Sequence, residues 1–536
     1  MVEQLVKEQK TKALTDVLWD ASNVLRNKMD ASEYKNYLLS LVFFKYLSDN
    51  QLGYVREVLE LEADNLEDVQ VAYEKEDEET RESIQEALLE EKEYAIPHDL
   101  TFTALMTKIN NQSFELADLA KVFREIEQSD EAFENLFEDV DLYSKKLGSV
   151  DSKRNATISD VMTKLSVLDL TDEVGDILGD AYEYLIASFA SQAGKKAGEF
   201  YTPHEVSELM TRIALLDEGK KGTSLYDATM GSGSLLLNAK RYSKAPERIQ
   251  YFGQELITST YNLARMNMIL HGVPVAHQNL RNGDTLDMDW PSDEPINFDA
   301  VLMNPPYSAN WSATKGFLDD PRFMGYGGKL APKSKADYAF LQHGLYHLKE
   351  SGTMVIVLPH GVLFRGNAEG TIRKELLKKG MIDAVIGLPG GIFYSTDIPT
   401  TILILKKNRT SKDVLFIDAS EEYTKKKAQN VLEQKHIDKI FDAYVKRENV
   451  DKFAHVAEFD EIKGNDYNLN IPRYVDTFEE EELIELEQVS GAINQTKAEL
   501  KKAEDKLFGL LGQLEGVDDS WDNEFQAFLG DLIGGK

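Results

Sequence analysis

The chain has 536 residues, of which 93 are acidic and 60 basic, so its formal net charge is −33. Hydrophobic residues make up 42% and aromatic residues 10% of the chain, which excludes a protein that is disordered throughout. The absence of cysteine excludes disulfides, thiolate metal sites and a cysteine nucleophile.

The length predicts three or four domains, at roughly 150 residues each. The polar start at 1–16 has no apolar signal region, and apolar runs such as 38–44 are far shorter than the roughly 18 residues of a membrane span. We therefore expect a cytoplasmic protein without membrane contact. Its negative charge repels nucleic acid, so a nucleic-acid substrate would require a basic partner chain or a local basic groove.

The first part of the chain is predicted to be helical. Apolar residues recur at helical spacing over 12–50, and this periodicity continues over 98–195. The acidic stretch 55–95 contains the run EKEDEET at 74–80, which is typical of a solvated helix face or loop. We expect a helical N-terminal domain over 1–165.

The pattern changes near residue 194, where the glycine-rich segment GKKAGEFYTP indicates a boundary or loop. Short apolar runs separated by amphipathic stretches then favour a parallel, doubly wound α/β sheet. This sheet is predicted to occupy about 195–410, within a second domain that covers 166–476. The runs lie at 224–228, 251–255, 298–303, 353–359, 383–389 and 400–405.

The tail, 477–536, is charged and predicted to be helical. From 479 onward, apolar residues recur every seven positions and form one seam: Leu486, Ile493, Leu500, Leu507 and Leu514. A helix with a single apolar seam packs against another helix, which could belong to a partner chain or to this chain's own body.

The first candidate site follows the first predicted strand. There the turn Asp227-Ala228-Thr229-Met230-Gly231-Ser232-Gly233 contains G-x-G, and glycine lets a backbone approach a ligand closely. Many strand-to-helix turns contain glycines for packing alone, so this motif is weak by itself.

Two carboxylates after later strands strengthen the prediction. Glu255 ends the next strand, where an acid commonly accepts hydrogen bonds from ribose hydroxyls. Asp284, in Asn282-Gly283-Asp284, could accept from an adenine amino group or could stabilise its own turn. Together with the glycine turn they predict an adenosine-containing ligand. The sequence lacks G-x-x-x-x-G-K-[ST], so a P-loop is not expected.

The most specific motif is Asn304-Pro305-Pro306-Tyr307, directly after the strand 298–303. Proline lacks an N–H donor, so this turn offers carbonyl and amide oxygens as acceptors beside an aromatic ring. Such a set suits a planar amine, which the acceptors hold while the ring stacks on it. A proline-rich strand exit with Tyr307 merely packing is the alternative.

Other chemistries find no support. The 9 histidines show no H-x-x-x-H or H-E-x-x-H spacing, so no metal site is expected. The sequence contains no G-x-S-x-G, and we identify no serine triad.

These motifs resemble those of the amino-methyltransferases that use S-adenosylmethionine. Over nearly its whole length the chain is similar to the modification (methyltransferase) subunit of type I restriction–modification systems. The similar segments are 18–49, 193–206, 335–366 and 467–476. The chain departs from many relatives after Asp227, where Ala228-Thr229-Met230 replaces Pro-Ala-Cys.

The resemblance implies a Rossmann-like methyltransferase domain between a helical N-terminal domain and a C-terminal helical tail. It implies transfer of a methyl group from S-adenosylmethionine to the N6 amine of a flipped adenine in DNA, without a metal. It also implies site roles. Asn304, Pro305, Pro306 and Tyr307 would be catalytic, and Tyr307 and Phe393 would cover the two faces of the base. The cofactor would lie on Glu199, Phe200, Tyr201, Thr202, Pro203, His204, Asp227, Thr229, Gly231, Ser232, Gly233, Glu255 and Asp284.

The resemblance implies partners as well. A separate specificity subunit would choose the DNA sequence, be clasped by two modification subunits and contact the tail 477–536. Restriction and motor subunits would join this complex, and double-stranded DNA would be bound through it. A methyltransferase for RNA or protein glutamine, and a non-catalytic cofactor-binding scaffold, are the alternative interpretations.

Overall fold

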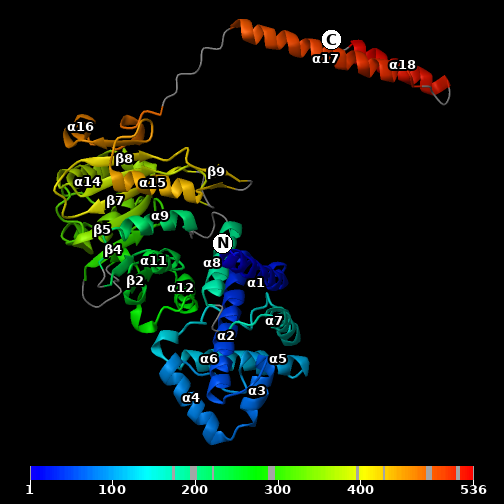
Figure 1. The fold of residues 1–536 in the computed structure, drawn as a ribbon, viewed down its shortest axis with the longest axis vertical. Coiled ribbons are helices and arrows are strands. Elements are labelled where there is room, and N and C mark those ends of the chain that lie inside the picture. Colours follow the sequence, from blue (N-terminus) through cyan, green and yellow to red (C-terminus); the bar gives the residue numbers. More distant parts are fainter. Residues whose placement is uncertain are drawn as a thin grey trace. The chain divides into compact units, whose positions relative to one another are not determined.

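The computed structural model describes residues 2–171, 175–193, 202–219, 222–287, 296–393, 398–426, 429–477, 486–514 and 519–534. The chain divides into two compact units, Met1–Asp476 and Thr477–Lys536, which are treated separately below (Figure 1).

The first part of the larger unit is helical, which confirms the prediction from apolar spacing. The acidic run 74–80 spans the end of one helix and the start of the next. There Asp77 caps the second helix by accepting from Thr80 N at 2.8 Å, so its charge stabilises a helix start. The helices are α1 (Val2–Arg26), α2 (Ala31–Val58), α3 (Leu66–Lys75), α4 (Glu78–Lys92), α5 (Phe102–Asn110), α6 (Leu116–Glu127), α7 (Asp151–Leu165) and α8 (Gly175–Ala193).

A sheet follows, and within the described residues it has the strand order β11-β8-β6-β7-β5-β4-β1-β2-β3. The six predicted runs are all strands in it, and β3, β8 and β11 extend it at its two ends. The strands are β1 (Ser224–Asp227), β2 (Gln250–Glu255), β3 (Gln278–Asn282), β4 (Phe298–Met303), β5 (Leu348–Pro359), β6 (Ile382–Gly387), β7 (Thr400–Lys406), β8 (Val414–Asp418) and β11 (Ala454–Ala457).

The sheet is mixed, whereas the sequence predicted a parallel one. Strands β1 to β5 run parallel to one another. Strand β7 lies antiparallel between β5 and β6, and β11 is antiparallel to β8. The physical reason is the connection between β6 and β7, residues 388–399, in which no described residue is helical. Without a crossover helix the chain returns beside β6 in the opposite direction.

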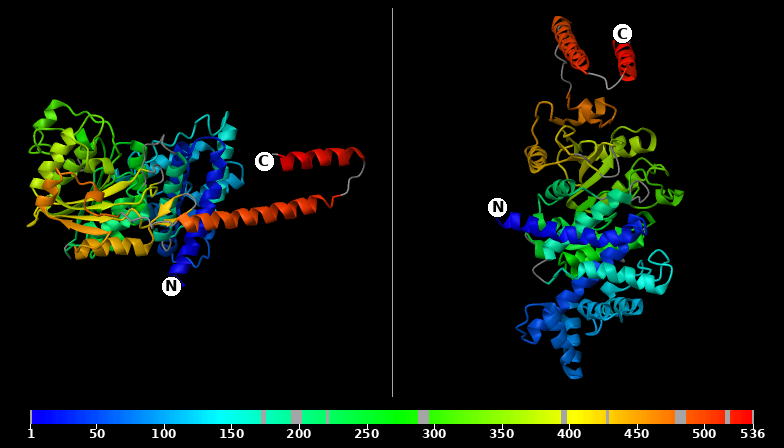
Figure 2. Two further views of the ribbon diagram at one scale, coloured as in Figure 1. Left: turned by 90° about the horizontal axis from the view of Figure 1, so that it is seen from above. Right: turned by 90° about the vertical axis from the view of Figure 1, so that its right-hand side faces the viewer.

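Helices cover both faces of the sheet (Figure 2), and alternating strand residues divide the core between these faces. Leu225 and Leu302 pack on one face, and their neighbours Tyr226 and Val301 pack on the other. The first face is covered by α9 (His204–Ala214), α10 (Ser234–Leu237), α12 (Thr258–Leu270) and α15 (Gln434–Lys446). The second is covered by α13 (Asp337–Tyr346), α14 (Asn367–Lys378) and α16 (Phe459–Gly464).

Helix α12 joins the sheet to the helical N-terminal part. Its Ala264 and Met268 pack in the core of the sheet, while Leu263, Met266 and Leu270 belong to the core of helices α1 to α8. These two sets occupy different faces of one helix, so α12 is buried from both sides.

The smaller unit contains α17 (Leu486–Leu511) and α18 (Asp519–Gly534). The predicted heptad positions of α17 are exposed: Leu486 by 85%, Ile493 by 50%, Leu500 by 58% and Leu507 by 48%. Among the described helices, none is long and apolar enough to cross a membrane.

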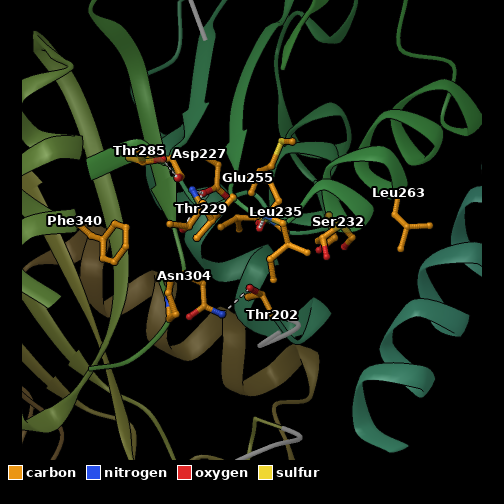
Figure 3. Close-up of a pocket in the computed structure, with 18 of the residues that line it drawn as sticks. Thr202, Asp227, Thr229, Ser232, Leu235, Glu255, Leu263, Thr285, Asn304 and Phe340 are labelled. Carbon is orange, nitrogen blue, oxygen red and sulfur yellow. Dashed lines mark hydrogen bonds between the residues drawn. The ribbon is translucent and has the colours of Figure 1, made fainter. Parts of the chain in front are cut away.

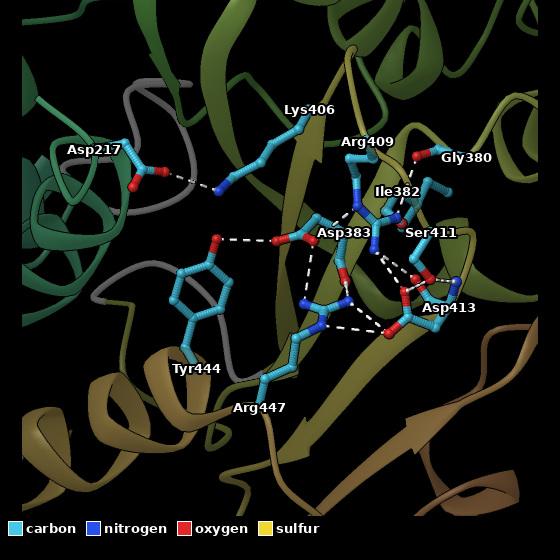
Figure 4. Close-up of polar contacts among 10 residues, drawn as sticks. All are labelled: Asp217, Gly380, Ile382, Asp383, Lys406, Arg409, Ser411, Asp413, Tyr444 and Arg447. Atoms are coloured by element: carbon cyan, nitrogen blue, oxygen red, sulfur yellow. Dashed lines mark hydrogen bonds and ion pairs between the residues drawn. The ribbon is translucent and has the colours of Figure 1, made fainter.

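A network of buried charges lies at the amino end of β6, the end opposite to the predicted site (Figure 4). Asp383 is buried and accepts from Arg409 Nε at 3.0 Å, Arg447 Nη1 at 3.1 Å and the Tyr444 hydroxyl at 2.9 Å. Asp413 pairs with the same arginines. The network connects β6, the turn after β7 and the end of α15.

We expect Asp383→Ala to lower the free energy of unfolding by about 3 kcal/mol, because the buried side chain of Arg409 and the half-buried side chain of Arg447 lose a charged partner. Urea unfolding of the full chain measures this change. Asp217→Ala is the matched control, since Asp217 is exposed by 69% and pairs with Lys406 at 3.3 Å, a contact worth less than about 1 kcal/mol. Equal effects of the two substitutions would contradict the assignment.

Candidate active site

A cavity of about 240 Å³ lies at the carboxyl ends of β1 to β4 (Figure 3). The chain leaves β1 toward β2 and β3, then returns to place β4 on the other side of β1. A crevice forms where the strand order reverses, and α/β proteins bind ligands there. Asp227, Glu255, Asp284 and Asn304 lie at or just after the ends of these strands, and all line the cavity.

The glycine turn forms one wall. Gly231 has φ +55°, and a Cβ atom there would meet no atom within 4 Å, so its backbone borders open space. Gly233 has φ +79° and lies against Met268 of α12. Met230 packs over Gly253 of β2, where a Cβ would lie 2.3 Å from its sulfur. A glycine in the neighbouring strand thus accommodates the methionine that replaces the usual cysteine.

Glu255 spans the turn and the start of α12. Its Oε2 accepts from Gly231 N at 3.1 Å and its Oε1 from Ile257 N at 2.8 Å. The bonds hold Glu255 in place at the edge of the cavity.

Asp284 stabilises its own turn and borders the cavity. Its Oδ1 accepts from Leu286 N at 2.9 Å, which stabilises the turn, and the residue also lines the cavity. The next residue, Thr285, donates from Oγ1 to Ala228 O at 2.6 Å and so connects this turn to the end of β1.

A fully buried arginine supports this turn from behind. Arg322 donates to Thr285 O and Leu286 O, both at 2.9 Å, and its charge is balanced by Asp320 at 2.8 Å. Its Nη1 also lies 3.2 Å from His343 Nδ1. Burial lowers the pKa of His343 well below its ordinary value, so the imidazole is neutral and can accept from Arg322.

Asp227 is buried at the centre of the cavity wall. Burial raises the pKa of its carboxyl to about 7, against hydrogen bonds from the backbone and side chain of Thr229 that lower it; nearby Glu255 raises it further. A carboxyl in this state is poised to ionise when a cation enters the cavity.

The Asn304 side chain is held in one orientation. Its Nδ2 donates to Thr202 Oγ1 at 2.9 Å, and its Oδ1 accepts from the Tyr307 hydroxyl at 2.9 Å. Tyr307 also contacts Phe393 edge to face, with ring centroids 6.2 Å apart and an interplanar angle of 80°. The two aromatic residues predicted for one substrate are therefore neighbours.

The cavity collects many of the predicted site residues, although not all. It is lined by Thr202, Asp227, Thr229, Gly231, Ser232, Glu255, Asp284, Asn304 and Pro306. Other predicted residues lie outside its lining: Pro203, His204, Gly233, Pro305, Tyr307 and Phe393. His204 begins α9 with an exposed side chain. Glu199, Phe200 and Tyr201 lie outside the described residues.

Family models match most of this chain. Residues 14–165 match the HsdM N-terminal domain, and residues 173–483 match N-6 DNA Methylase. The type I restriction enzyme MpnII methylase subunit of Mycoplasma pneumoniae is 35% identical, over 93% of this chain and 95% of that protein. The MjaVIII methylase subunit of Methanocaldococcus jannaschii is 32% identical, over 96% and 86%.

A crystal structure adds a close structural match. The type I restriction-modification system methyltransferase subunit from Streptococcus thermophilus is 64% identical to this chain, with a TM-score of 0.85. The match covers 87% of this chain and 100% of that one. The chain belongs to the type I restriction enzyme methylase subunits. It is an adenine-specific DNA methyltransferase of the N6 type, as the resemblance implied.

Sequence reasoning missed several residues that line the cavity of this methylase subunit. Leu263 and Phe340 come from α12 and α13, and Lys35 and Ile186 come from α2 and α8 of the helical part. None belongs to a motif beside a strand end, so no local pattern indicated them. Within the described residues, no group of His, Asp and Glu side chains is placed to hold a metal ion.

The raised pKa of Asp227 predicts a pH-dependent cost to stability. The folded pKa of about 7 exceeds the ordinary value of 3.8, so the contribution of Asp227 to stability falls as pH rises toward 7 and levels off above it. Asp227→Asn removes this dependence. We expect its stability relative to wild type to increase by about 2 kcal/mol between pH 5 and 7, then stay constant to pH 8.

Urea unfolding of both proteins at each pH measures the difference. The exposed Asp217→Asn serves as the control and should give a difference that does not change with pH. A flat difference for Asp227→Asn would show that this carboxyl is not shifted.

Proposed function

We propose that the cavity binds S-adenosylmethionine and that the turn Asn304–Tyr307 holds the N6 amine of an adenine flipped out of DNA. The observation that carries this proposal is the position of Asn304. Its amide lines the same cavity as Asp227, Glu255 and Asp284, so an amine acceptor borders a ligand site rich in carboxylates.

The residues of the cavity fit this cofactor. Open space beside Gly231 admits a ligand close to the backbone, and Glu255 at the mouth of the turn suits ribose hydroxyls. Asp284 and Thr285 would border the adenine, while Thr202 and Ser232 would border the methionine part. The buried Asp227 would be ionised by the positive charge of the bound cofactor. When bound, the cofactor supplies a methyl group activated by its sulfonium.

The amine of adenine is a poor nucleophile, because its lone pair is delocalised into the ring. Asn304 Oδ1 and the Pro305 carbonyl would accept hydrogen bonds from the two N–H groups of the amine and so favour a tetrahedral nitrogen. Thr202 would keep Oδ1 aimed at the amine by accepting from Nδ2. Catalysis then consists of positioning and electrostatic complementarity, effects worth several kcal/mol.

The target base would displace a contact that is present in this structure. The Tyr307 hydroxyl now donates to Asn304 Oδ1, the oxygen that the amine requires. Tyr307 would turn away from Asn304 and stack on the base, with Phe393 on the opposite face. Flipping the base costs a few kcal/mol, and stacking returns about 1–3 kcal/mol.

We expect Asn304→Ala to abolish N6-adenine methylation and to leave cofactor affinity within about threefold, because the adenosine contacts are elsewhere. Base-modification sequencing of host DNA measures the first effect, and calorimetry on the purified chain measures the second. Tyr307→Phe, which removes only the competing hydroxyl, should retain methylation. Methylation that persists in Asn304→Ala would overturn the proposed role.

We further propose an organisation in three parts, with a helical domain at 1–165, a methyltransferase domain at 166–476 and a contact region at 477–536. The apolar seam of α17 would bind a specificity subunit that reads the DNA, and two copies of this chain would clasp it. Exposed leucines such as Leu500 and Leu507 support a partner helix. Restriction and motor subunits would join the same cytoplasmic complex.

Deletion of 479–536 should abolish co-purification with the specificity subunit, because the seam would be lost, while cofactor binding persists. The double variant Leu500→Lys/Leu507→Lys should have the same effect through charges placed in the seam. Lys501→Ala, at an exposed position next to the seam, is the control and should co-purify normally. An intact complex after the deletion would refute this contact.

A further inference from the structure

The helical part of the chain contributes a lysine to the cofactor cavity. Lys35, in the second turn of α2, is exposed by only 8% and lines the cavity together with Ile186 of α8. A lysine is seldom buried to this degree unless charged or polar groups surround its ammonium. The burial of Lys35 therefore calls for charged or polar groups near its ammonium.

Hydrogen bonds from α12 hold the segment 132–139 of the helical part. Arg265 of α12 donates to Glu134 O at 2.9 Å and also to Ala132 O. Asn262, one turn earlier, donates to Asn135 O at 3.1 Å and to Asp139 Oδ2 at 3.2 Å. These bonds hold the helical part against the same helix whose other face packs on the sheet, so they position Lys35 relative to the cavity.

Lys35 lies near the middle of α12, because its charge acts on Asp139, and Asp139 Oδ2 accepts from Asn262 Nδ2 of α12 at 3.2 Å. Figure 3 shows Ser232 and Leu263 on one side of the cavity, and Thr285 and Phe340 on the other. Leu263 packs within the core of helices α1 to α8, as does Tyr34, the neighbour of Lys35. The helical part thus closes the side of the cavity where Ser232 lies.

The charges of the lining are unequal. Among the described residues that line the cavity, Lys35 is the only one with a basic side chain, whereas Asp227, Glu255 and Asp284 are acidic. Lys35 lies close enough to Asp139 to lower the pKa of that carboxyl. Burial has the larger effect and raises the pKa of Asp139 overall.

We propose that Lys35 binds the carboxylate of the methionine part of S-adenosylmethionine. This inference rests on the proposed function. The cofactor has a sulfonium, an ammonium and one carboxylate. The acidic lining suits the two cations and the ribose, but only Lys35 has the charge that the carboxylate requires. The helical domain then takes part in cofactor recognition, and adenosine derivatives without the carboxylate are discriminated by a residue outside the methyltransferase domain.

The test compares two ligands that differ in one group. The affinities of S-adenosylmethionine and of decarboxylated S-adenosylmethionine are measured by calorimetry on the full-length wild type, Lys35→Met and Lys35→Arg. We expect wild type to prefer the carboxylated ligand and Lys35→Met to lose about 10- to 100-fold of this preference. Lys35→Arg should retain it, since the positive charge is kept. Lys28→Met is the matched control, because Lys28 bonds to Thr157 at 2.8 Å outside the cavity lining.

The outcomes separate the two proposals. Equal weakening of both ligands in Lys35→Met would mean a structural role and would overturn the inference, as would unchanged affinity for both. If wild type binds neither ligand, the proposed cofactor itself is wrong. If wild type binds both ligands and Lys35→Met keeps the wild-type preference between them, the proposed function stands and this inference fails.

Discussion

The arrangement of the site depends on the reversal of strand order at β1. Because β2 and β4 both lie beside β1 and run parallel to it, the residues that follow these strands meet at one edge of the sheet. Glu255 and Asn304 are far apart in the chain, yet this edge brings both to one cavity with Asp227. Where the strand order reverses, the segments that follow neighbouring strands diverge and leave a crevice that can accept a ligand.

Around this edge, most side chains are held by bonds to neighbouring turns. Glu255 bridges the glycine turn and α12, Thr285 connects its turn to the end of β1, and Arg322 supports that turn from the core. These bonds preorganise the site, so the adenosine part of the proposed cofactor would require little rearrangement. The side that we propose for the amine differs, because the Tyr307 hydroxyl donates to Asn304 Oδ1 in this structure and would have to give way to a base. Binding of the cofactor would therefore require less side-chain rearrangement than binding of the base.

The helical part is integral to the catalytic unit, since α12 is buried between it and the sheet. Lys35 and Ile186 reach the cavity from this part, so domain packing and ligand binding are coupled. The chain's net charge of −33 opposes long-range attraction of DNA, which is consistent with recognition by another subunit. The exposed seam of α17 is the surface that we propose for such a subunit.

The sequence by itself determined the helical first part, the strands around the site, and the motif residues Asp227, Glu255 and Asn304. Their signals are local, because apolar periodicity and turn chemistry depend on nearby residues. Only the tertiary structure decided the antiparallel place of β7, the support by Arg322 and the entry of Lys35 into the cavity. Strand direction depends on how a connection folds back, and contacts across more than a hundred residues leave no periodic trace along the chain. Their energies depend on burial and partners, which exist only once the chain has folded.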